Sequence, residues 1–248
     1  MRQEDWKPID VDSLEPNAEK VVRSNCNMLV TAGPGAGKTE LLAQRACYLL
    51  QTDTCKSPKK ILAISFKRDA ADNLKQRVKL RCGKDFADRF VSVTYDSFFK
   101  DILDRFKAAL PDDYSVKDYD ITSIDRRETR NLIDSCGIPD VSFEELQSIS
   151  HETLENVLLC GKPLSQIASN SLEDKVSTKI WHNFLKEKKL TFMMISRLCE
   201  LILETNPIII KCLQETFSHV FLDEFQDTTK IQYGILTRCF KNSSCILT

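Results

Sequence analysis

Two groups of residues in this chain could do phosphate chemistry, and they lie about 185 residues apart. The first is a glycine-rich run that ends in a lysine and a threonine, Ala32-Gly33-Pro34-Gly35-Ala36-Gly37-Lys38-Thr39. The second begins with two adjacent carboxylates, in Asp223-Glu224-Phe225-Gln226-Asp227. Backbone N–H groups of a glycine-rich turn can hold phosphate oxygens, and adjacent carboxylates can hold Mg²⁺ and orient a water. Together the two groups predict the core of an ATPase.

Each side chain has an expected role in that chemistry. Lys38 should reach the β- and γ-phosphates of ATP, and the hydroxyl of Thr39 should ligate Mg²⁺. Asp223 should help to hold the metal, and Glu224 should position the attacking water as a base. Each group alone has a plainer explanation, a glycine turn with an incidental lysine or a strand that ends in two surface carboxylates. Their combination favours ATP and Mg²⁺ as cofactors.

The composition is that of a globular protein with reduced thiols. The chain has 248 residues, is 42% hydrophobic and carries a formal net charge of −1, so it can bury one or two cores. Its ten cysteines are scattered without a Cys-x-x-Cys pair, and its three histidines lie far apart. A disulfide framework or a histidine–cysteine metal site is therefore not expected. The N-terminus lacks an apolar signal region, and no apolar run is long enough to span a membrane, which favours a cytoplasmic protein.

Charge is distributed unevenly along the chain. Residues 56–84 contain ten Lys and Arg against two Asp, a local excess of eight positive charges. Such a block is often only a solvated helix face. It can also neutralise a phosphate backbone, and the sequence by itself leaves both readings open.

The supporting elements follow from short apolar runs that alternate with helical patterns. Five strands are expected at Met28–Thr31, Ile61–Ser65, Val91–Val93, His219–Leu222 and Cys245–Thr248. Between the first three strands, apolar residues recur at helical spacing, as in Leu41, Leu42, Ala46 and Leu49. Alternation of strand and helix predicts an α/β fold, a parallel sheet with helices on both faces.

The middle of the chain breaks this alternation. From about residue 111 to residue 204 it is acidic, and helical periodicity is visible in Phe143–Leu158 and Thr191–Leu203. We therefore expect three segments. Residues 1–110 and 205–248 should form the two parts of the ATPase domain, and residues 111–204 should form a helical insertion between them.

Several segments resemble the UvrD/Rep/PcrA group of superfamily 1 DNA helicases. Asp223 to Thr228, followed by Gln232, is similar to the extended Walker B motif of that family, D-E-F-Q-D-T-N-x-x-Q. Residues 61–71 resemble its L-A-V-T-F-T-N-K-A-A motif, and residues 94–98 its T-F-H-S-F motif. The resemblance covers nearly the whole chain. It implies a RecA-like P-loop NTPase fold, 3′→5′ polarity, and a role for Gln226 in coupling the γ-phosphate state to the DNA surface.

By the same resemblance, the segments after the second and third strands contact single-stranded DNA. Phe66 and Tyr95 are candidates for stacking on bases, although aromatic residues at strand ends often belong to a core. The hydroxyls of Ser65, Thr94 and Ser97 could donate hydrogen bonds to phosphates. Lys67 and Arg68, which lie in the basic block, are the candidates for neutralising backbone charge.

The sequence also departs from the family pattern. Ala32 takes the place of the first glycine of the loop, and Ala18 aligns with the glutamine that reads adenine. Glu40 follows Thr39 where the family often has arginine, on the base side of the nucleotide. Asp69 and Asp96 replace a basic residue and a histidine in the DNA segments. These changes predict weaker base discrimination and an altered DNA path.

The family pattern continues beyond what this sequence contains. Residues 243–248 resemble the strand that leads to the next family motif, V-G-D-x-x-Q, and neither that motif nor a second RecA-like domain follows. We therefore expect the ATPase half of a helicase or translocase, as a fragment, a truncated product or one piece of a split motor. A second copy or a partner chain would then supply the missing half. The alternative is a nucleotide-dependent DNA- or protein-binding regulatory module without motor activity.

Overall fold

The structure is a computed structural model that describes residues 1–33, 35–135, 137–138, 141–149, 163–166 and 171–248. Its chain forms two compact units, Met1–Phe98 with Ile208–Thr248, and Phe99–Pro207. Along the chain, the boundaries of these units fall inside helix α5 (Tyr95–Phe106) and at the start of helix α11 (Pro207–Thr216). The boundaries expected from the sequence were 110/111 and 204/205. All the candidate chemical residues lie in the first unit.

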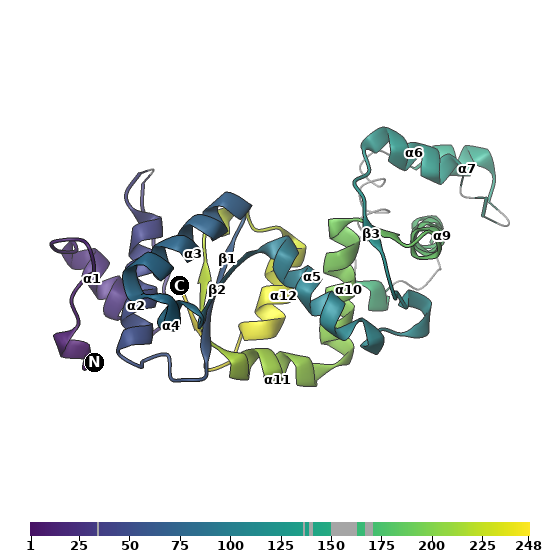
Figure 1. The fold of residues 1–248 in the computed structure, drawn as a ribbon. Coiled ribbons are helices and arrows are strands. Elements are labelled where there is room, and N and C mark those ends of the chain that lie inside the picture. The colour runs from purple at the N-terminus through teal and green to yellow at the C-terminus, as the bar shows by residue number, and fades with distance from the viewer. Residues whose placement is uncertain (34, 136, 139–140, 150–162, 167–170) are drawn as a thin grey trace. The chain divides into compact units, whose positions relative to one another are not determined.

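The first unit alternates strands and helices as the sequence indicates (Figure 1). Its strands are β1 (Lys60–Ser65), β2 (Phe90–Thr94), β5 (Phe217–Leu222) and β6 (Ile246–Leu247). Its α-helices, besides α5 and α11, are α1 (Pro16–Arg23), α2 (Lys38–Gln51), α3 (Arg68–Cys82), α4 (Lys84–Ala87) and α12 (Lys230–Phe240). Two short 3₁₀ helices, Gln3–Asp5 and Phe225–Asp227, complete it.

The four strands form one sheet in the order β2-β1-β5-β6, and every neighbouring pair is parallel. Strand β1 lies in the middle and is buried from Ile61 to Ser65, as expected for a parallel strand covered on both faces. Helices α2 and α3 lie on one side of the sheet and α12 on the other (Figure 1). The predicted α/β fold with a parallel sheet is thus confirmed.

The strand expected at Met28–Thr31 does not form. This segment makes one backbone hydrogen bond to β6, from Met28 N–H to the Leu247 carbonyl at 3.0 Å. The return bond, from Leu247 N–H, goes to the side chain of Asn27 at 2.9 Å. Leu29 is 79% exposed, so the apolar pattern that suggested a strand is not buried here. Because β6 has only two residues, it offers too short a ladder to fix the segment as a strand.

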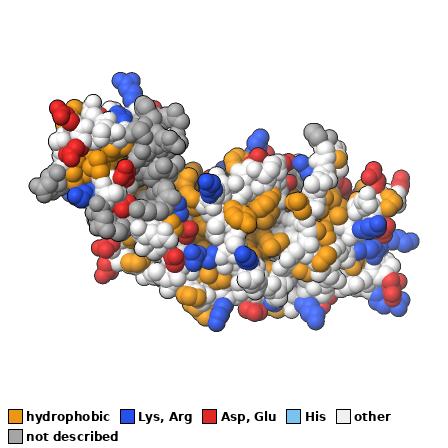
Figure 2. Space-filling view, turned by 180° about the vertical axis from the view of Figure 1, so that it is seen from behind, with side chains coloured by type: hydrophobic (Ala, Val, Ile, Leu, Met, Phe, Trp, Pro, Cys, Tyr) orange, Lys and Arg blue, Asp and Glu red, His pale blue; other side chains and the backbone are white. Residues whose placement is uncertain are grey.

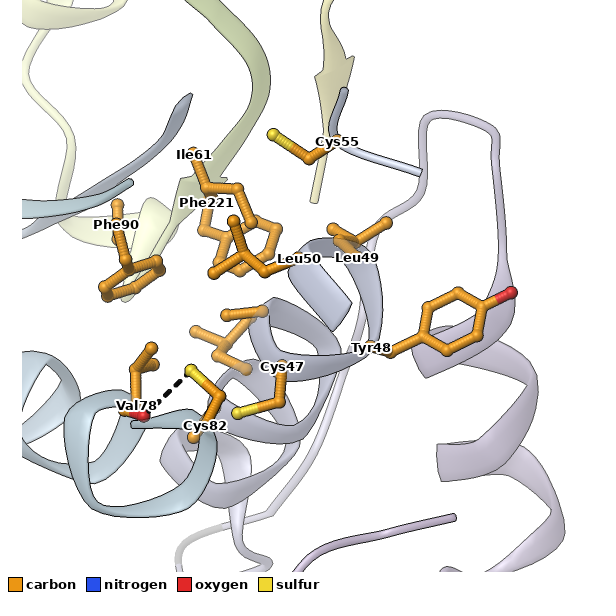
Figure 3. Close-up of a cluster of buried hydrophobic side chains, with 14 of the residues drawn as sticks. Cys47, Tyr48, Leu49, Leu50, Cys55, Ile61, Val78, Cys82, Phe90 and Phe221 are labelled. Carbon is orange, nitrogen blue, oxygen red and sulfur yellow. Dashed lines mark hydrogen bonds between the residues drawn. The ribbon is translucent and has the colours of Figure 1, made fainter. Parts of the chain in front are cut away.

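A hydrophobic core fixes α2 against the sheet and against α3. Cys47 and Leu50 of α2, Val78 of α3, Ile61 of β1 and Phe221 of β5 are all less than 2% exposed and converge in one cluster (Figure 3). Burying each large side chain stabilises the fold by roughly 1.5–3 kcal/mol. Helix α2 is therefore anchored against the sheet along its buried face.

A buried arginine holds the chain that leads into the glycine-rich loop. The Nη1 atom of Arg45 donates to the carbonyls of Val21, Val22 and Ser24 at 2.6, 3.1 and 2.9 Å. These carbonyls lie at the C-terminal end of α1 and its cap, where the last carbonyls of a helix have no donor one turn further along the helix. Burial lowers the pKa of Arg45 to about 10, so the guanidinium keeps its charge at neutral pH.

The second unit is mainly helical. Besides the end of α5 it contains α6 (Arg126–Asp134), α7 (Phe143–Gln147), α9 (Leu172–Lys186) and α10 (Phe192–Thr205). It also has 3₁₀ helices at Lys107–Ala109, Asp112–Tyr114 and Leu164–Gln166, and a parallel pair of two-residue strands, β3 (Asp120–Ile121) and β4 (Lys189–Leu190). That strand pair was not predicted. Residues 150–158 of the expected helix at Phe143–Leu158 lie outside the described residues.

Candidate nucleotide and nucleic-acid site

The carboxyl ends of three parallel strands bring the candidate residues to one edge of the sheet. Ser65 at the end of β1 pairs in register with Thr94 at the end of β2. On the other side of β1, Ile64 pairs with Leu222, and Asp223 N–H donates to the Ile64 carbonyl at 2.9 Å. Side chains that follow these strands therefore gather at the edge where parallel α/β sheets bind ligands.

The glycine-rich loop ends in an open helix N-terminus. Gly35 and Gly37 have φ of 73° and 75°, a left-handed conformation that side chains disfavour. Gly37 is the N-cap of α2, and it has no side chain to accept the first N–H groups of the helix. Those N–H groups and the helix dipole favour an anion at this end. The loop residues Ala32, Gly33, Ala36 and the two glycines thus form a candidate phosphate cradle, while Pro34 lies outside the described residues.

Lys38 and Glu224 face each other across this cradle. Lys38 Nζ lies 3.1 Å from Glu224 Oε1, and the Gln226 side-chain amide donates a short hydrogen bond to Glu224 Oε2. The hydrogen bonds from Gln226 and Lys38 hold the pKa of Glu224 below its usual value. The lysine and glutamate side chains are 36% and 38% exposed, so a ligand can reach and replace their ion pair.

Glu224 also has an unusual backbone. Its φ and ψ are 51° and 44°, the left-handed region that residues other than glycine rarely adopt. Such strain costs about 1–3 kcal/mol and is found most often at functional sites. The conformation lets the chain turn sharply after β5, so that both Asp223 and Glu224 stay near the end of the strand.

Asp223 and Thr39 offer oxygen ligands suited to Mg²⁺. Burial first, and then the negative charge of Glu224, raise the pKa of Asp223, while the charge of Lys38 opposes that rise. Two adjacent carboxylates of this kind would be relieved by a divalent cation. Protein Mg²⁺ sites often use only one or two side chains beside phosphate oxygens. Within the described residues there is no group of three His, Cys, Asp or Glu that could hold a metal by itself.

The structure divides the candidate DNA residues into exposed and buried ones. Phe66 is 49% exposed, and Lys67, Arg68 and Ser97 are exposed as well, so all four are accessible to a strand of DNA. Ser65 is fully buried, and its hydroxyl lies close enough to Asp223 to lower the pKa of that carboxyl. A side-chain contact from Ser65 to DNA is incompatible with this burial.

Thr94 and Tyr95 have structural partners. Thr94 caps helix α5, since its Oγ1 accepts from Ser97 N–H at 3.2 Å and donates to Ser97 Oγ at 2.9 Å. Tyr95 is only 2% exposed, and its hydroxyl lies 2.9 Å from Thr228 Oγ1. Tyr95 therefore cannot stack on a base in this conformation. Instead it links the end of β2 to the segment after Glu224, a link that Thr228 completes and that the sequence did not reveal.

On its other side, the first turn of α2 carries a network that sequence reasoning missed. Glu40 Oε2 accepts from Arg77 at 2.9 Å and from Arg81 at 2.7 Å, and Glu40 Oε1 accepts from Arg81 and Gln44, each at 2.8 Å. Arg81 also bonds Asp10 at 3.1 Å. Burial raises the pKa of Glu40, but the hydrogen bonds from Arg81, Gln44 and Arg77 outweigh that and hold it below its usual value. The spacing of four between Arg77 and Arg81 was the available signal, since it puts both on one face of α3.

Comparison with known proteins gives a consistent result. The family model described as the UvrD/REP helicase N-terminal domain matches residues 14–248. The ATP-dependent DNA helicase PcrA of Leuconostoc citreum is 26% identical over 227 residues, 88% of this chain and 30% of the relative. DNA helicase II of Escherichia coli strain K12 is 25% identical over 233 residues, 90% of this chain and 31% of the relative. The chain thus spans about 30% of the length of these relatives.

A third relative agrees with these two. PcrA of Staphylococcus aureus strain Mu50 is 27% identical over 236 residues, 91% of this chain and 31% of the relative.

Among the described residues, no helix is both long and apolar enough to cross a bilayer.

Proposed function

This chain belongs to the UvrD/REP helicase N-terminal domain family, and on that premise we propose that it binds and hydrolyses ATP as the ATPase part of a DNA helicase or single-stranded DNA translocase. The observation that carries the proposal is the ion pair of Lys38 with Glu224 at the open N-terminus of α2, with Gln226 bonded to the same carboxylate. A lysine, a base and an amide that meet at a phosphate cradle are the parts that phosphoryl transfer needs.

The proposed mechanism begins with exchange of partners. The phosphates of ATP enter the N-terminus of α2, and Lys38 leaves Glu224 to bond the β- and γ-phosphate oxygens. Thr39 and Asp223 would hold Mg²⁺, which would neutralise phosphate charge. Glu224 is then free to accept a hydrogen bond from the attacking water and to hold it in line with the γ-phosphorus. Because Gln226 is bonded to Glu224, loss of the γ-phosphate can be coupled through Gln226 to the DNA-binding surface.

DNA binding is proposed for the exposed residues that follow β1 and β2. Phe66 offers an aromatic face to a base, and Lys67 and Arg68 offer charge to phosphates. Ser97 adds a hydroxyl. The negative charges of the neighbouring Asp69 and Asp96 would restrict the path of the DNA backbone. Burial raises the pKa of Asp96, so this carboxyl is protonated more readily beside a phosphate.

Movement along DNA is proposed to need a second RecA-like domain, from the same polypeptide, a second copy or a partner chain. Such a domain supplies arginines that stabilise the transferred phosphoryl group and can be worth roughly 10³–10⁵ in rate. The 3′→5′ direction is proposed from the family resemblance, as is a cytoplasmic location. A second candidate function, a nucleotide-gated binding module, is favoured by one observation: Ser65 and Tyr95, two expected DNA contacts, are buried.

The test is ATP turnover by this chain with and without single-stranded DNA, beside Glu224→Gln. An ATPase motor predicts turnover that DNA stimulates and that falls by roughly 10²–10⁴ in the variant, because the base is lost. The matched control is Asp227→Asn, which removes an exposed carboxylate three residues away. ATP binding without turnover in either condition would mean that this chain is half of a motor that needs its second domain, or a nucleotide-gated binding module. No ATP binding at all would refute both.

A further inference from the structure

Two cysteines meet where helix α2 packs against helix α3. Cys47 lies within α2 and is fully buried, and Cys82 is the last residue of α3 and is 8% exposed. Both belong to one hydrophobic cluster, in which the two side chains are neighbours and the sulfur of Cys47 is turned toward Cys82 (Figure 3). The two residues are 35 positions apart in the sequence, so only the fold brings them together.

Hydrogen bonds fix how the two thiols face each other. The thiol of Cys82 donates to the Val78 carbonyl, one turn earlier in α3, at 3.1 Å. The sulfur of Cys82 in turn accepts a hydrogen bond from the Cys47 thiol. This hydrogen bond lowers the pKa of Cys82 and, together with burial, raises the pKa of Cys47. Cys82 is therefore the thiol that loses its proton more readily, and Cys47 lies in position to react with it.

Cys82 is also the thiol that a small oxidant can reach. It ends α3 and is followed by Gly83, whose φ of 81° stops the helix. A side chain added at Gly83 would meet no atom of the described residues within 4 Å beyond its chain neighbours, so there is open space beside the end of α3. Helix ends also fray more readily than helix middles. The more acidic thiol of the pair is thus the one closer to solvent.

We propose that Cys82 and Cys47 form a redox-sensitive modification site, at which hydrogen peroxide joins α3 to α2 through a reversible disulfide. The Cys82 thiolate attacks one oxygen of the peroxide, the O–O bond breaks, and the leaving hydroxide takes the proton that Cys82 gave up, which makes water. The sulfur of Cys47 then attacks the sulfur of the Cys82 sulfenic acid. The S–S bond forms, the S–O bond breaks, and the hydroxide leaves as water with the proton of Cys47. The two thiols lose two electrons, and the peroxide is reduced to two waters.

The disulfide acts on the frame of the first unit rather than on the proposed chemistry. Cys47 follows Lys38 by nine residues, about 14 Å along α2. The link ties α2, whose first turn carries Lys38, to α3, which begins at the candidate DNA residue Arg68. Because it closes a loop of 35 residues, it restricts the unfolded chain and should raise the urea midpoint of unfolding. Neither ATP nor DNA is needed to observe the disulfide, so its test is independent of the proposed function.

Treatment of the folded chain with hydrogen peroxide, followed by proteolysis and mass spectrometry, tests the proposal. The expected product is a pair of peptides joined between Cys47 and Cys82, which dithiothreitol separates, and the oxidised chain should unfold at a higher urea concentration than the reduced chain. In Cys47→Ala the Cys82 sulfenic acid has no partner, so it should proceed to sulfinic acid, which dithiothreitol does not reverse. Cys239→Ala is the matched control, because it removes another fully buried cysteine and should leave the Cys47–Cys82 link intact.

Three results would overturn the proposal. Oxidation of the exposed Cys26 and Cys212 without joined Cys47 and Cys82 peptides would show that the pair is closed to peroxide. A link between Cys47 and Cys82 that forms only in urea would show that the fold holds the two sulfurs apart. Oxidation of Cys82 that dithiothreitol reverses fully in Cys47→Ala would show that Cys47 is not its partner. If Cys47→Ala does not fold, the peptide map of the wild-type chain still decides, because it needs no variant.

Discussion

The two sides of the first turn of α2 differ in how their charges are held. On one side, Lys38 and Glu224 form a single ion pair in which both side chains are more than a third exposed. On the other, Glu40 is 21% exposed and accepts four hydrogen bonds from Arg77, Arg81 and Gln44. An exposed pair contributes little and exchanges easily, whereas a half-buried, multiply bonded carboxylate is part of the fold. The first turn of α2 therefore has an exposed, exchangeable ion pair on one side and a fixed network of charges on the other.

Of these variants, Lys38→Ala should have the largest effect, a loss of ATP affinity with little change in the stability of the fold. Its loss removes charge-assisted hydrogen bonds to phosphate oxygens, each worth roughly 1.5–3 kcal/mol, so affinity for ATP should fall about a hundredfold. The free energy of unfolding should change by roughly 1 kcal/mol or less, since the ion pair is exposed. Calorimetry and urea unfolding measure the two quantities. Unchanged ATP affinity would sink the assignment of Lys38 to the phosphates.

Glu40→Ala should show the opposite pattern. The change leaves Arg77 and Arg81 without the carboxylate that both bond, which should lower the free energy of unfolding by about 2 kcal/mol. Affinity for tripolyphosphate should stay close to that of the wild type. Urea unfolding provides the measurement, and Lys38→Ala is its matched control from the same helical turn. If Glu40→Ala is as stable as Lys38→Ala, the two sides of the turn do not differ as described.

Glu224→Gln should have a smaller effect than Lys38→Ala, and in the opposite direction, on ATP affinity. In the free protein Glu224 pairs with Lys38, the lysine proposed to bind the phosphates, so removal of its charge should raise ATP affinity about two- to fivefold. Calorimetry under the conditions used for Lys38→Ala measures the change. Asp227→Asn is the control for a general loss of negative charge. Weaker binding by Glu224→Gln would mean that the carboxylate does not compete with ATP for Lys38.

The elements that position the site were predictable because their signals are local. The expected strands Ile61–Ser65, Val91–Val93 and His219–Leu222 each lie within an observed strand that is one or two residues longer. Each is a compact apolar run between turn signals, and burial on both faces makes such runs easy to find. The strand expected at Met28–Thr31 was wrong, because a strand also needs a neighbour, and β6 provides only two residues.

The non-local parts of the site could not be predicted. Glu40 bonds arginines that are 37 and 41 residues away, and Tyr95 bonds Thr228 at a separation of 133 residues. Nothing in the local sequence tells which carboxylate an arginine on a helix face will reach. Likewise, the family resemblance that suggested DNA contacts at Ser65 and Tyr95 carried no information on burial. Motif spacing predicted which residues come to the sheet edge, but not which of them face solvent.

The smallest expected effect is a pH dependence confined to the Glu40 side. Because the pKa of Glu40 in the folded chain lies below its usual value of 4.5, its network contributes stability above that pH. The contribution is lost as the pH falls below 4.5 and through the folded pKa. The difference in urea midpoint between wild-type chain and Glu40→Gln should therefore stay constant from pH 7 to about pH 5 and shrink below pH 4.5. Glu224→Gln is the contrast, because the pKa of Glu224 is also lowered, yet its exposed pair stabilises the fold too little for the same test to register. Equal pH profiles for the two variants would mean that the arginines hold Glu40 no more firmly than Lys38 holds Glu224.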